Sequence, residues 1–480
     1  MQWETVIGLE VHVQLNTLSK IFSGSSTAFG AAPNTQANAV DLALPGTLPV
    51  INEQAIHHAI RFGIAVDAKI AQETFFERKN YFYPDLPKGY QTSQMVAPIV
   101  GAGHLEIELK DGSTKKIQIH HAHLEEDAGK SLHEDFHGQT GIDLNRAGTP
   151  LVEIVTEPDI SSIEEAVTFA KKLHSLVTSI GITDGEMSQG SMRFDVNVSV
   201  RPYGQTELGT RTETKNLNSF KFMEDAIALE VERQIDLIES GGKVIQQTRL
   251  YNGQTGVAKA MRSKEEANDY RYFPCPDLLP IVIPETLVED IKASMPELPE
   301  QKQQRFIADF GLSKYDAALI SSDSHTSAFF EQSLAITKEA KLLANWLLGD
   351  LAAWQNQQDQ ALNECPVTPE KLATLINKIK DNTLSNKMAK QVFEIILKEG
   401  GDVEDIIEQK GLKQESDSGK LKALIDDIIK NNPKQVEQYL NAEPAKQKKL
   451  LGFFVGQMMK ATQGKANPAI INQLLIAKLK

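Results

Sequence analysis

The sequence HAHLEEDAGK, residues 121–130, places two histidines, three acidic residues and one lysine within ten positions. It continues a strand-like run over residues 116–122. If the strand runs on, alternation puts His121, His123 and Glu125 on one face and Leu124 and Glu126 on the other. Imidazole and carboxylate groups held side by side are typical of divalent-metal sites. We therefore expect the first 290 residues to surround a metal and phosphoryl-transfer site.

The end of this stretch also invites comparison with a phosphate-binding P-loop. Gly129-Lys130-Ser131 matches the last three residues of the P-loop motif, but Leu124 occupies the position where that motif requires a glycine. A P-loop is therefore excluded, although Lys130 stays a candidate for contact with a phosphate.

Three other segments predict strands that carry polar groups on one face. Residues 5–15 alternate, with Glu10 and His12 side by side on the polar face. Residues 192–201 alternate in the same way and expose Asp195, and residues 210–215 add Glu213. If the four strands share a sheet, their acids form an acidic floor able to hold one or two Mg²⁺ ions. Each strand alone is equally consistent with a solvated face, and periodicity does not show which strands are neighbours.

Basic residues accompany these acids along the chain. Cations beside metal-binding acids are what phosphoryl transfer needs, because catalysis there depends mainly on positioning and charge. The candidates for neutralising phosphates are Lys130, Arg146, Arg193, Arg211 and Lys215.

Two segments mix basic and aromatic residues, and we expect both to be loops. The first covers residues 77–90, and the second covers residues 261–274 within an irregular stretch from 249 to 280. Such a composition suits stacking on bases or ribose with Arg or Lys on phosphates. A packed surface loop is the alternative.

Composition and length predict several domains in a soluble globular protein. A chain of 480 residues with 41% hydrophobic and 24% charged residues suggests about two to four domains. No apolar run approaches the ~18 residues that span a bilayer. Cys275 and Cys365 are the only cysteines, which excludes a disulfide framework and a thiolate zinc site. With no apolar leader at the N-terminus, we expect the cytoplasm.

The charge is distributed unevenly. Residues 410–480 hold 13 lysines and 6 acidic residues, which gives them a net charge of +7. The whole chain has a net charge of −14, so the rest of the chain carries −21. A basic tail on an acidic body suggests that the tail binds a polyanion. A solvated helical surface would also explain it.

These patterns predict an α+β protein. A domain that contains the predicted strands, over residues 1–293, is expected to precede an all-α helical domain over 294–404 and a small all-α tail domain over 405–480. The proline-rich stretch 280–299 marks the first boundary.

Seven segments in order along the whole chain resemble the B subunits of the bacterial aspartyl/glutamyl-tRNA(Asn/Gln) amidotransferase, the GatB family. They are GLEVHVQL (8–15), RKNYFYPDLPKGYQ (78–91), HLEEDAGKS (123–131), DLNRAGTPLVEIVTEPDI (143–160), KNLNSF (215–220), MRSKEEANDYRYFP (261–274) and GFFVGQMMKA (452–461).

The resemblance implies one component of a heterotrimeric ligase. Its partners would be an amidase (glutaminase), which releases ammonia from glutamine, and a small third chain. This component would contain a mixed-sheet cradle domain. It would use ATP and Mg²⁺ to phosphorylate the side-chain carboxylate of Glu-tRNA(Gln) or Asp-tRNA(Asn), and ammonia would then displace the phosphate. The helical tail would bind tRNA.

The resemblance also assigns residues. It implies metal ligands at Glu10, His12, Glu125, Glu126, Asp195 and Glu213. Glu126, Glu213, Arg146 and Lys215 are then the expected catalytic residues, with Lys130, Arg193 and Arg211 binding the nucleotide. The chain departs from the family at Ser188 and Gln189, which replace acids often found there, and at Phe194, which replaces a frequent cysteine.

Two rival functions remain on the residues alone. A metal-dependent ligase for a small carboxylate would not need the basic tail. A non-catalytic tRNA-binding scaffold would tolerate loss of the acids. The sequence does not distinguish Glu-tRNA(Gln) from Asp-tRNA(Asn) as the substrate.

Overall fold

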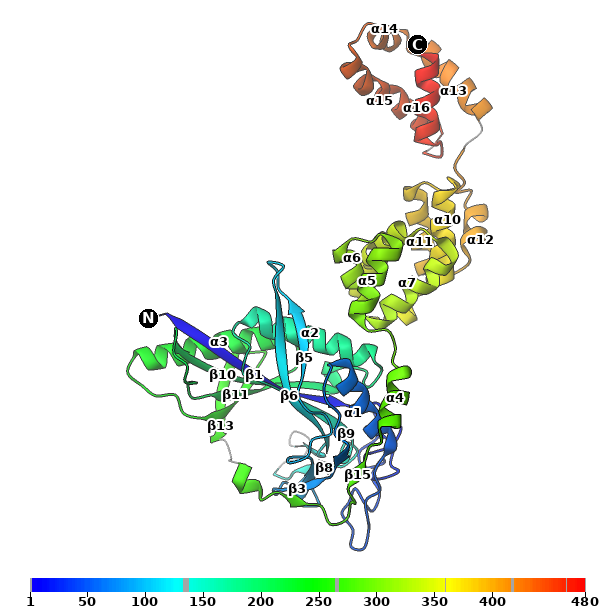
Figure 1. Cartoon of the computed structure of the whole chain (residues 1–480). Helices are drawn as coiled ribbons and strands as arrows, with labels where there is room; N and C mark the ends of the chain where they lie inside the picture. The colour runs from blue at the N-terminus through cyan, green and yellow to red at the C-terminus, as the bar shows by residue number, and fades with distance from the viewer. Residues whose placement is uncertain are drawn as a thin grey trace. The chain divides into compact units, whose positions relative to one another are not determined.

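The computed structural model describes residues 2–132, 138–263, 267–358, 360–415, 418–462 and 464–479. It divides into two compact units, Met1–Pro299 and Glu300–Lys480 (Figure 1). Within the expected basic–aromatic segment 261–274, residues 264–266 lie outside the described residues.

The N-terminal unit is built on one eight-stranded sheet. Neighbouring strands are antiparallel except for β11 and β12, which are parallel, so the sheet is mixed as expected. In sheet order the strands are β13 (Val257–Ser263), β12 (Gln247–Asn252), β11 (Thr212–Leu217), β10 (Met192–Pro202), β1 (Trp3–Gln14), β9 (Pro150–Thr156), β6 (Thr114–Glu126) and β5 (Gly103–Glu108).

The alternation seen in the sequence determines which face of the sheet is covered. Ile7, Leu9 and Val11 are at most 1% exposed and belong to the core, while Glu10 and His12 face the other way. Helices α2 (Ile163–Ser179) and α3 (Phe220–Glu239) pack on the apolar face (Figure 1). The polar face is thereby left for a site.

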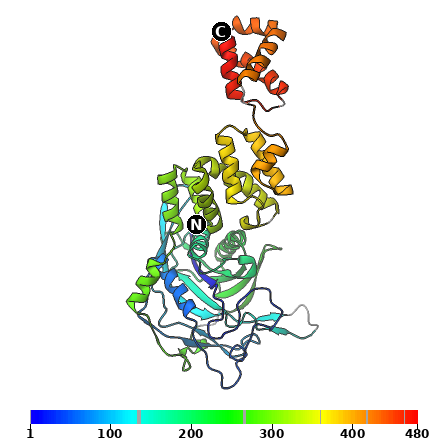
Figure 2. The ribbon, with the colours of Figure 1, turned by 90° about the vertical axis from the view of Figure 1, so that its right-hand side faces the viewer.

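Side-chain caps begin the three long helices of this unit. Asn52 caps α1 (Glu53–Ala65), Ser162 caps α2 and Ser219 caps α3, each by accepting a backbone N–H of the first turn. Helix α1 lies beside α4 (Glu285–Ala293), as Figure 2 shows.

The prediction that residues 249–280 form an irregular stretch is wrong in its first half. Strands β12 and β13 form an antiparallel hairpin at the edge of the large sheet. Their sequences alternate weakly, and pairing with β11 and with each other supplies the backbone hydrogen bonds that favour the strand. The hairpin is therefore determined by strand pairing in the folded protein and not by a strong local sequence pattern.

Three small sheets surround the large one. The most relevant joins β14 (Phe273–Pro274), β3 (Glu77–Asn80) and β4 (Tyr90–Ser93). The others pair β15 (Ile281–Val282) with β2 (Glu73–Thr74), and β7 (Lys130–Leu132) with β8 (Gly141–Asp143).

Every regular element in the described residues of the C-terminal unit is a helix. These are α5 (Pro299–Phe310), α6 (Lys314–Ser321), α7 (Ser324–Thr337), α8 (Ala340–Trp346), α9 (Ala352–Gln358), α10 (Pro369–Lys380), α11 (Asn386–Glu399), α12 (Val403–Gln409), α13 (Ser418–Asn431), α14 (Pro433–Leu440), α15 (Pro444–Ala461) and α16 (Pro468–Lys478).

Two separate hydrophobic cores hold these helices. One extends from Phe306 to Ile407 and the other from Leu421 to Leu479. Helix α12 continues across the boundary expected at 404–405, and its Ile406 and Ile407 pack with the first core. Among the described residues of the chain, no helix combines the length and apolar composition needed to cross a bilayer.

Candidate functional site

The acidic residues of five strands meet on the polar face of the large sheet. Strand register explains why: Glu10 of β1 lies opposite Asp195 of β10, and His12 lies opposite Glu153 of β9. On the next strand, β6, His123 is also opposite Glu153. The alternation of side chains along each strand determines which face of the sheet a residue occupies. The pairing register determines which residues of neighbouring strands lie side by side. The neighbour relation that periodicity left open is therefore resolved.

The first acidic cluster consists of His12, Glu125 and Glu153. The His12 Nε2 atom lies 3.3 Å from Glu153 Oε2 and 3.5 Å from Glu125 Oε1. The His123 Nε2 atom approaches the same two carboxylates at 3.6 and 3.8 Å. Two imidazoles thus face two carboxylates.

The second acidic cluster consists of Glu10, Asp195 and Glu213. The Lys215 ammonium lies 2.5 Å from Asp195 Oδ2 and 3.3 Å from Glu213 Oε1. Thr248 Oγ1 donates to Glu213 Oε2 at 2.7 Å, and Asn197 Nδ2 donates to Glu10 Oε1 at 3.1 Å. These bonds fix the directions of the carboxylate oxygens.

The protonation of the first cluster follows from its charges. Burial disfavours a charged His12, but Glu153, Glu125 and Asp195 outweigh burial and raise its pKa to about 9. Glu153 and Glu125 raise the pKa of His123 against burial. Burial would raise the pKa of Glu153, but His123, His12 and Lys79 hold it well below its usual range. The imidazolium proton of His12 therefore neutralises part of the carboxylate charge at neutral pH.

A cavity of about 880 Å³ lies over both clusters. Its walls carry cations, since Lys79 of β3, Arg193 of β10, Arg211 and Lys215 line it. Burial opposes the charged forms of Lys79 and Lys215, but nearby acids and phenol groups raise both pKa values. Anionic and cationic groups thus face one water-accessible space.

Each cluster has the donor set of a cation site. One ligand atom from each of its three residues lies within 4.8 Å of the others. The second cluster offers only carboxylate oxygens, which suits Mg²⁺. The first cluster adds the His12 imidazole, which can ligate a metal only once it has lost the proton that its raised pKa favours. Both clusters therefore fit a divalent cation, and the oxygen-only cluster fits Mg²⁺ better.

The structure separates Glu126 from these clusters. Side chains alternate along β6, so Glu126 turns away from the side of Glu125. It forms an ion pair with Lys88 and accepts a hydrogen bond from the Thr92 backbone N–H at 2.8 Å. Its geometry is that of a residue that holds β4 against β6.

Two expected phosphate contacts also lie outside the residues that line the cavity. Lys130 is exposed on the short strand β7. Arg146 donates to the backbone carbonyls of Ala128 and Gly129 at 3.0 and 2.8 Å and lies 3.4 Å from Asp127. Arg193 contacts the same aspartate at 3.1 Å but also lines the cavity.

The sequence interpretation missed Glu153 and Lys79. Glu153 interrupts the apolar run from Leu151 to Val155, and a lone acid within a buried strand was a signal that could have identified it. Lys79 belongs to the segment assigned to bases and phosphates, but nothing local places it over the acids.

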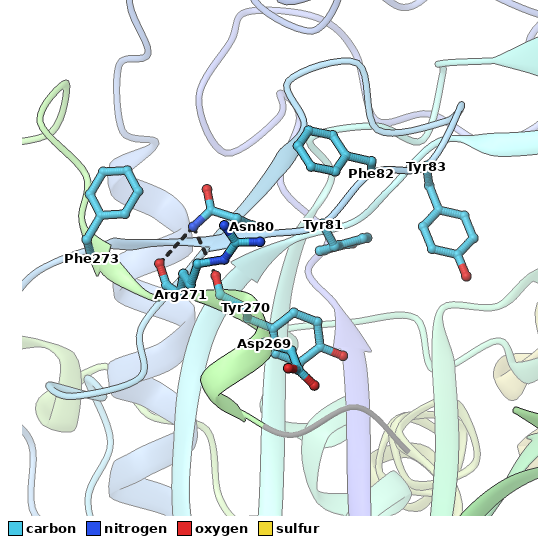
Figure 3. Close-up of a pocket in the computed structure, with 8 residues that line it drawn as sticks. All are labelled: Asn80, Tyr81, Phe82, Tyr83, Asp269, Tyr270, Arg271 and Phe273. Carbon is cyan, nitrogen blue, oxygen red and sulfur yellow. Dashed lines mark hydrogen bonds between the residues drawn. The ribbon is translucent and has the colours of Figure 1, made fainter. Parts of the chain in front are cut away.

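The two basic–aromatic segments come together beside the cavity. They line a second cavity of about 760 Å³, which we call the aromatic cleft (Figure 3). Its residues are Asn80, Tyr81, Phe82, Tyr83, Asp269, Tyr270, Arg271 and Phe273. Tyr81, Tyr83 and Tyr270 line both cavities, so the two cavities adjoin.

Two family models match the chain. Residues 5–289 match the GatB/GatE catalytic domain, and residues 328–479 match the GatB domain.

Full-length relatives agree with these matches. The B subunits of aspartyl/glutamyl-tRNA(Asn/Gln) amidotransferase from Cellvibrio japonicus and Saccharophagus degradans are each 64% identical to the chain over 479 residues. The corresponding protein from Pseudomonas savastanoi is 58% identical. In each case the match covers 100% of both chains.

Proposed function

The chain belongs to the GatB family of aspartyl/glutamyl-tRNA(Asn/Gln) amidotransferase B subunits, and we propose that its acidic floor activates the substrate carboxylate. It is one component of a ligase that converts mischarged Glu-tRNA(Gln) or Asp-tRNA(Asn). We define the acidic floor as the two clusters, His12–Glu125–Glu153 and Glu10–Asp195–Glu213. The family supports catalysis over the scaffold alternative.

The chemistry requires activation because an ionised carboxylate is a poor electrophile for ammonia. In the proposed reaction, a carboxylate oxygen attacks the γ-phosphorus of ATP and ADP leaves. Ammonia then attacks the carbonyl carbon of the acyl phosphate, inorganic phosphate leaves, and the nitrogen loses a proton. The products are an amide, ADP and phosphate.

The observation that supports this proposal is the meeting of both clusters and several cations around one cavity. Mg²⁺ held by the clusters would neutralise charge on the phosphates of ATP. Lys79, Arg193 and Arg211 line the same cavity and can pair with phosphate oxygens. Lys215 is held by Asp195 and Glu213, so it places a fixed positive charge at the floor.

Glu126 and Arg146 have supporting roles in this proposal. Glu126 holds β4, and Arg146 holds the turn at Ala128 and Gly129 that borders the cavity. Both are therefore positioning residues.

The enzyme works with partner subunits and tRNA. We further propose that the partners are an amidase that supplies ammonia and a small third chain, and that the complex acts in the cytoplasm, where translation takes place. The helices after residue 405 are proposed to bind tRNA through exposed lysines such as Lys446, Lys449 and Lys460.

The test of the floor uses the complete complex with ammonium chloride, ATP and Mg²⁺, so that glutamine hydrolysis is bypassed. Glu213→Gln keeps the side-chain shape but removes the charge. It is expected to abolish amidation while tRNA binding and assembly stay intact. Glu207→Gln, an exposed residue six positions earlier, is the matched control. Full activity of the Glu213 variant would show that carboxylate activation takes place elsewhere.

The test of the tail measures tRNA affinity against salt. Replacing Lys446, Lys449 and Lys460 by Gln is expected to weaken binding and reduce the slope of log K against log salt by up to about 2. Replacing the exposed Lys341, Lys387 and Lys398 of the first helical core region is the control. Equal slopes in both triple variants would contradict a tRNA-binding tail.

A further inference from the structure

We propose that Glu230, on the opposite face of the large sheet, is a positioning residue that holds Glu213 and Thr248 in place at the acidic floor. This role rests on the proposed function, because it concerns how the second acidic cluster is held. Glu230 belongs to helix α3, which packs on the apolar face of the sheet, and it is 1% exposed. It can therefore affect the floor only through the strands that lie between.

The first contact of Glu230 joins helix α3 to the strand that carries Glu213. Thr212 Oγ1 donates to Glu230 Oε1 at 2.6 Å, and Thr212 directly precedes Glu213 in β11. Because side chains alternate along a strand, Thr212 faces the helix and Glu213 faces the floor. The Glu230 carboxylate is thus bound directly behind an acid of the second cluster.

The second contact reaches the neighbouring strand β12. Arg249 Nε lies 3.1 Å from Glu230 Oε2, and the Arg249 guanidinium also donates to the backbone carbonyl of Ala258 in β13 at 2.7 Å. Arg249 directly follows Thr248, whose hydroxyl donates to Glu213 at 2.7 Å on the floor side. Glu230 therefore restrains β11 and β12 from one face of the sheet, and the bond between Thr248 and Glu213 joins them on the other.

Gln234, one helical turn after Glu230, extends the network to a third strand. Its Nε2 atom donates to Thr212 Oγ1 at 2.9 Å and to the backbone carbonyl of Val198 in β10 at 3.0 Å. Val198 directly follows Asn197, which orients another carboxylate of the second cluster. Three strands that carry or orient this cluster are thus attached to α3 at one point.

Strand pairing at this edge of the sheet is irregular, which explains why such support is needed. The register between β10 and β11 shifts between Phe194 and Val196, and the register between β12 and β13 shifts between Thr248 and Arg249. Strands β11 and β12 pair over three residues, whereas β1 and β10 pair over eleven. Bulges bend a strand and redirect its side chains. Backbone pairing alone therefore fixes Glu213 less firmly than it fixes the residues of β1.

The charge of Glu230 favours a role in geometry. Burial would raise its pKa, but hydrogen bonds from Arg233, Thr212 and Gln234 outweigh burial and lower it. Arg233 Nε donates to Glu230 Oε2 at 2.9 Å. Replacing a buried ion pair by apolar side chains often leaves stability unchanged, so such a pair is not explained by stability alone. Its directional bonds do explain how two strands are held at a fixed level.

The experiment uses the complete amidotransferase complex and the variant Glu230→Gln, which keeps the side-chain shape but removes the charge. Thr212→Val is the second variant, because it removes only the hydroxyl and keeps the branched side chain. Glu165→Gln is the matched control. Glu165 is 7% exposed in α2 and pairs with Lys115 at 2.8 Å, ten residues before Glu125 on β6.

Two measurements follow the floor without relying on turnover. Binding of Mn²⁺, as a probe for Mg²⁺, is measured by electron paramagnetic resonance without ATP, and Glu213→Gln identifies the signal of the second cluster. Amide hydrogen exchange is measured over residues 212–215 and 247–250. Both test variants should weaken this Mn²⁺ binding roughly 10-fold, as loss of a group that orients metal ligands typically does, and should speed exchange in both segments. Glu165→Gln should change neither quantity, although it also removes a buried charge.

A double variant tests whether Glu230 acts through the bond between Thr248 and Glu213. Thr248→Val removes that bond directly. If Glu230 works by holding it, adding Glu230→Gln to Thr248→Val should cost little further Mn²⁺ affinity, because residues of one network are not additive. Fully additive losses would show that the two residues act separately and would overturn the proposal.

Unchanged Mn²⁺ affinity and unchanged exchange in Glu230→Gln and Thr212→Val would also overturn it. If Glu230→Gln does not assemble, Thr212→Val decides alone. The proposed function fails in a different way. If Glu213→Gln abolishes amidation while the Glu230 and Thr212 variants behave as wild type, the positioning role fails and the proposed function stands. If Glu213→Gln is fully active while exchange changes as expected, the positioning role stands and the proposed function fails.

Discussion

The acidic floor and the aromatic cleft lie beside three shared tyrosines but are built in different ways. The floor consists of side chains from adjacent strands β6, β9, β1, β10 and β11, whose hydrogen-bonded register fixes each carboxylate. The cleft consists of two irregular segments joined by Asn80 and by the short pair β3–β14.

The difference suggests a division of work. Charges that hold a cation and phosphates must be placed accurately, and strands in a large sheet provide a rigid scaffold. Stacking tolerates small shifts, because it depends on ring area and not on single atoms. We therefore expect substitutions in the floor to affect catalysis more than substitutions in the cleft.

The largest expected effect is at Glu153. Glu153→Gln removes the carboxylate that faces both His12 and His123, so amidation should fall at least about 100-fold. Steady-state rates with ammonium chloride measure this loss. Glu157→Gln, four residues later on the same segment, is the control. Near wild-type rates for Glu153→Gln would remove this residue from the floor.

A second prediction separates two neighbouring acids of β6. Glu125 and Glu126 are 2% and 4% exposed, yet they face opposite sides. Glu125→Gln should abolish amidation with little change in the free energy of unfolding. Glu126→Gln removes the charged partner of the Lys88 ammonium, which keeps only its hydrogen bond to Thr92 Oγ1, and should reduce that free energy by about 3 kcal/mol.

Thermal unfolding together with the rate per folded molecule distinguishes these two variants. If Glu126→Gln lowers the rate as strongly as Glu125→Gln without loss of stability, then Glu126 acts in the reaction itself. The assignment of both acids to the metal would then be preferred.

A third prediction concerns the connection between the two segments of the cleft. Asn80→Ala leaves the carbonyls of Tyr270 and Arg271 without their donor, which should cost about 1–3 kcal/mol locally. Amide hydrogen exchange should increase over residues 269–273 but not in β1. Unchanged exchange would show that other contacts hold the cleft.

The smallest expected effect is at the exposed ring of Phe82. Phe82→Ser should change the free energy of unfolding by less than about 0.5 kcal/mol, because the side chain is mostly in solvent. Phe29→Ser, at a ring that is 75% exposed outside the cleft, is the control and should give an equally small change in thermal unfolding. A clearly larger loss of stability in Phe82→Ser would show that its ring packs within the cleft.

Sequence patterns predicted much of the floor because alternation is a local property. The strands with Glu10, Asp195 and Glu213 were identified from period two alone, and the same rule correctly placed Glu125 and Glu126 on opposite faces. Polar residues on the exposed face of each strand were visible without knowing its neighbours. The resemblance to a known family added the activity, and the family matches confirm that assignment.

Tertiary structure alone decided which strands are neighbours and which segments meet. Glu153 joined the floor because β9 lies between β1 and β6, and Lys79 lies over the acids because β3 folds across them. The hairpin β12–β13 was missed because its strands depend on pairing for stability. The cleft joins residues 80–83 with residues 269–273. Such contacts are set by the packing of distant segments, which no local periodicity encodes.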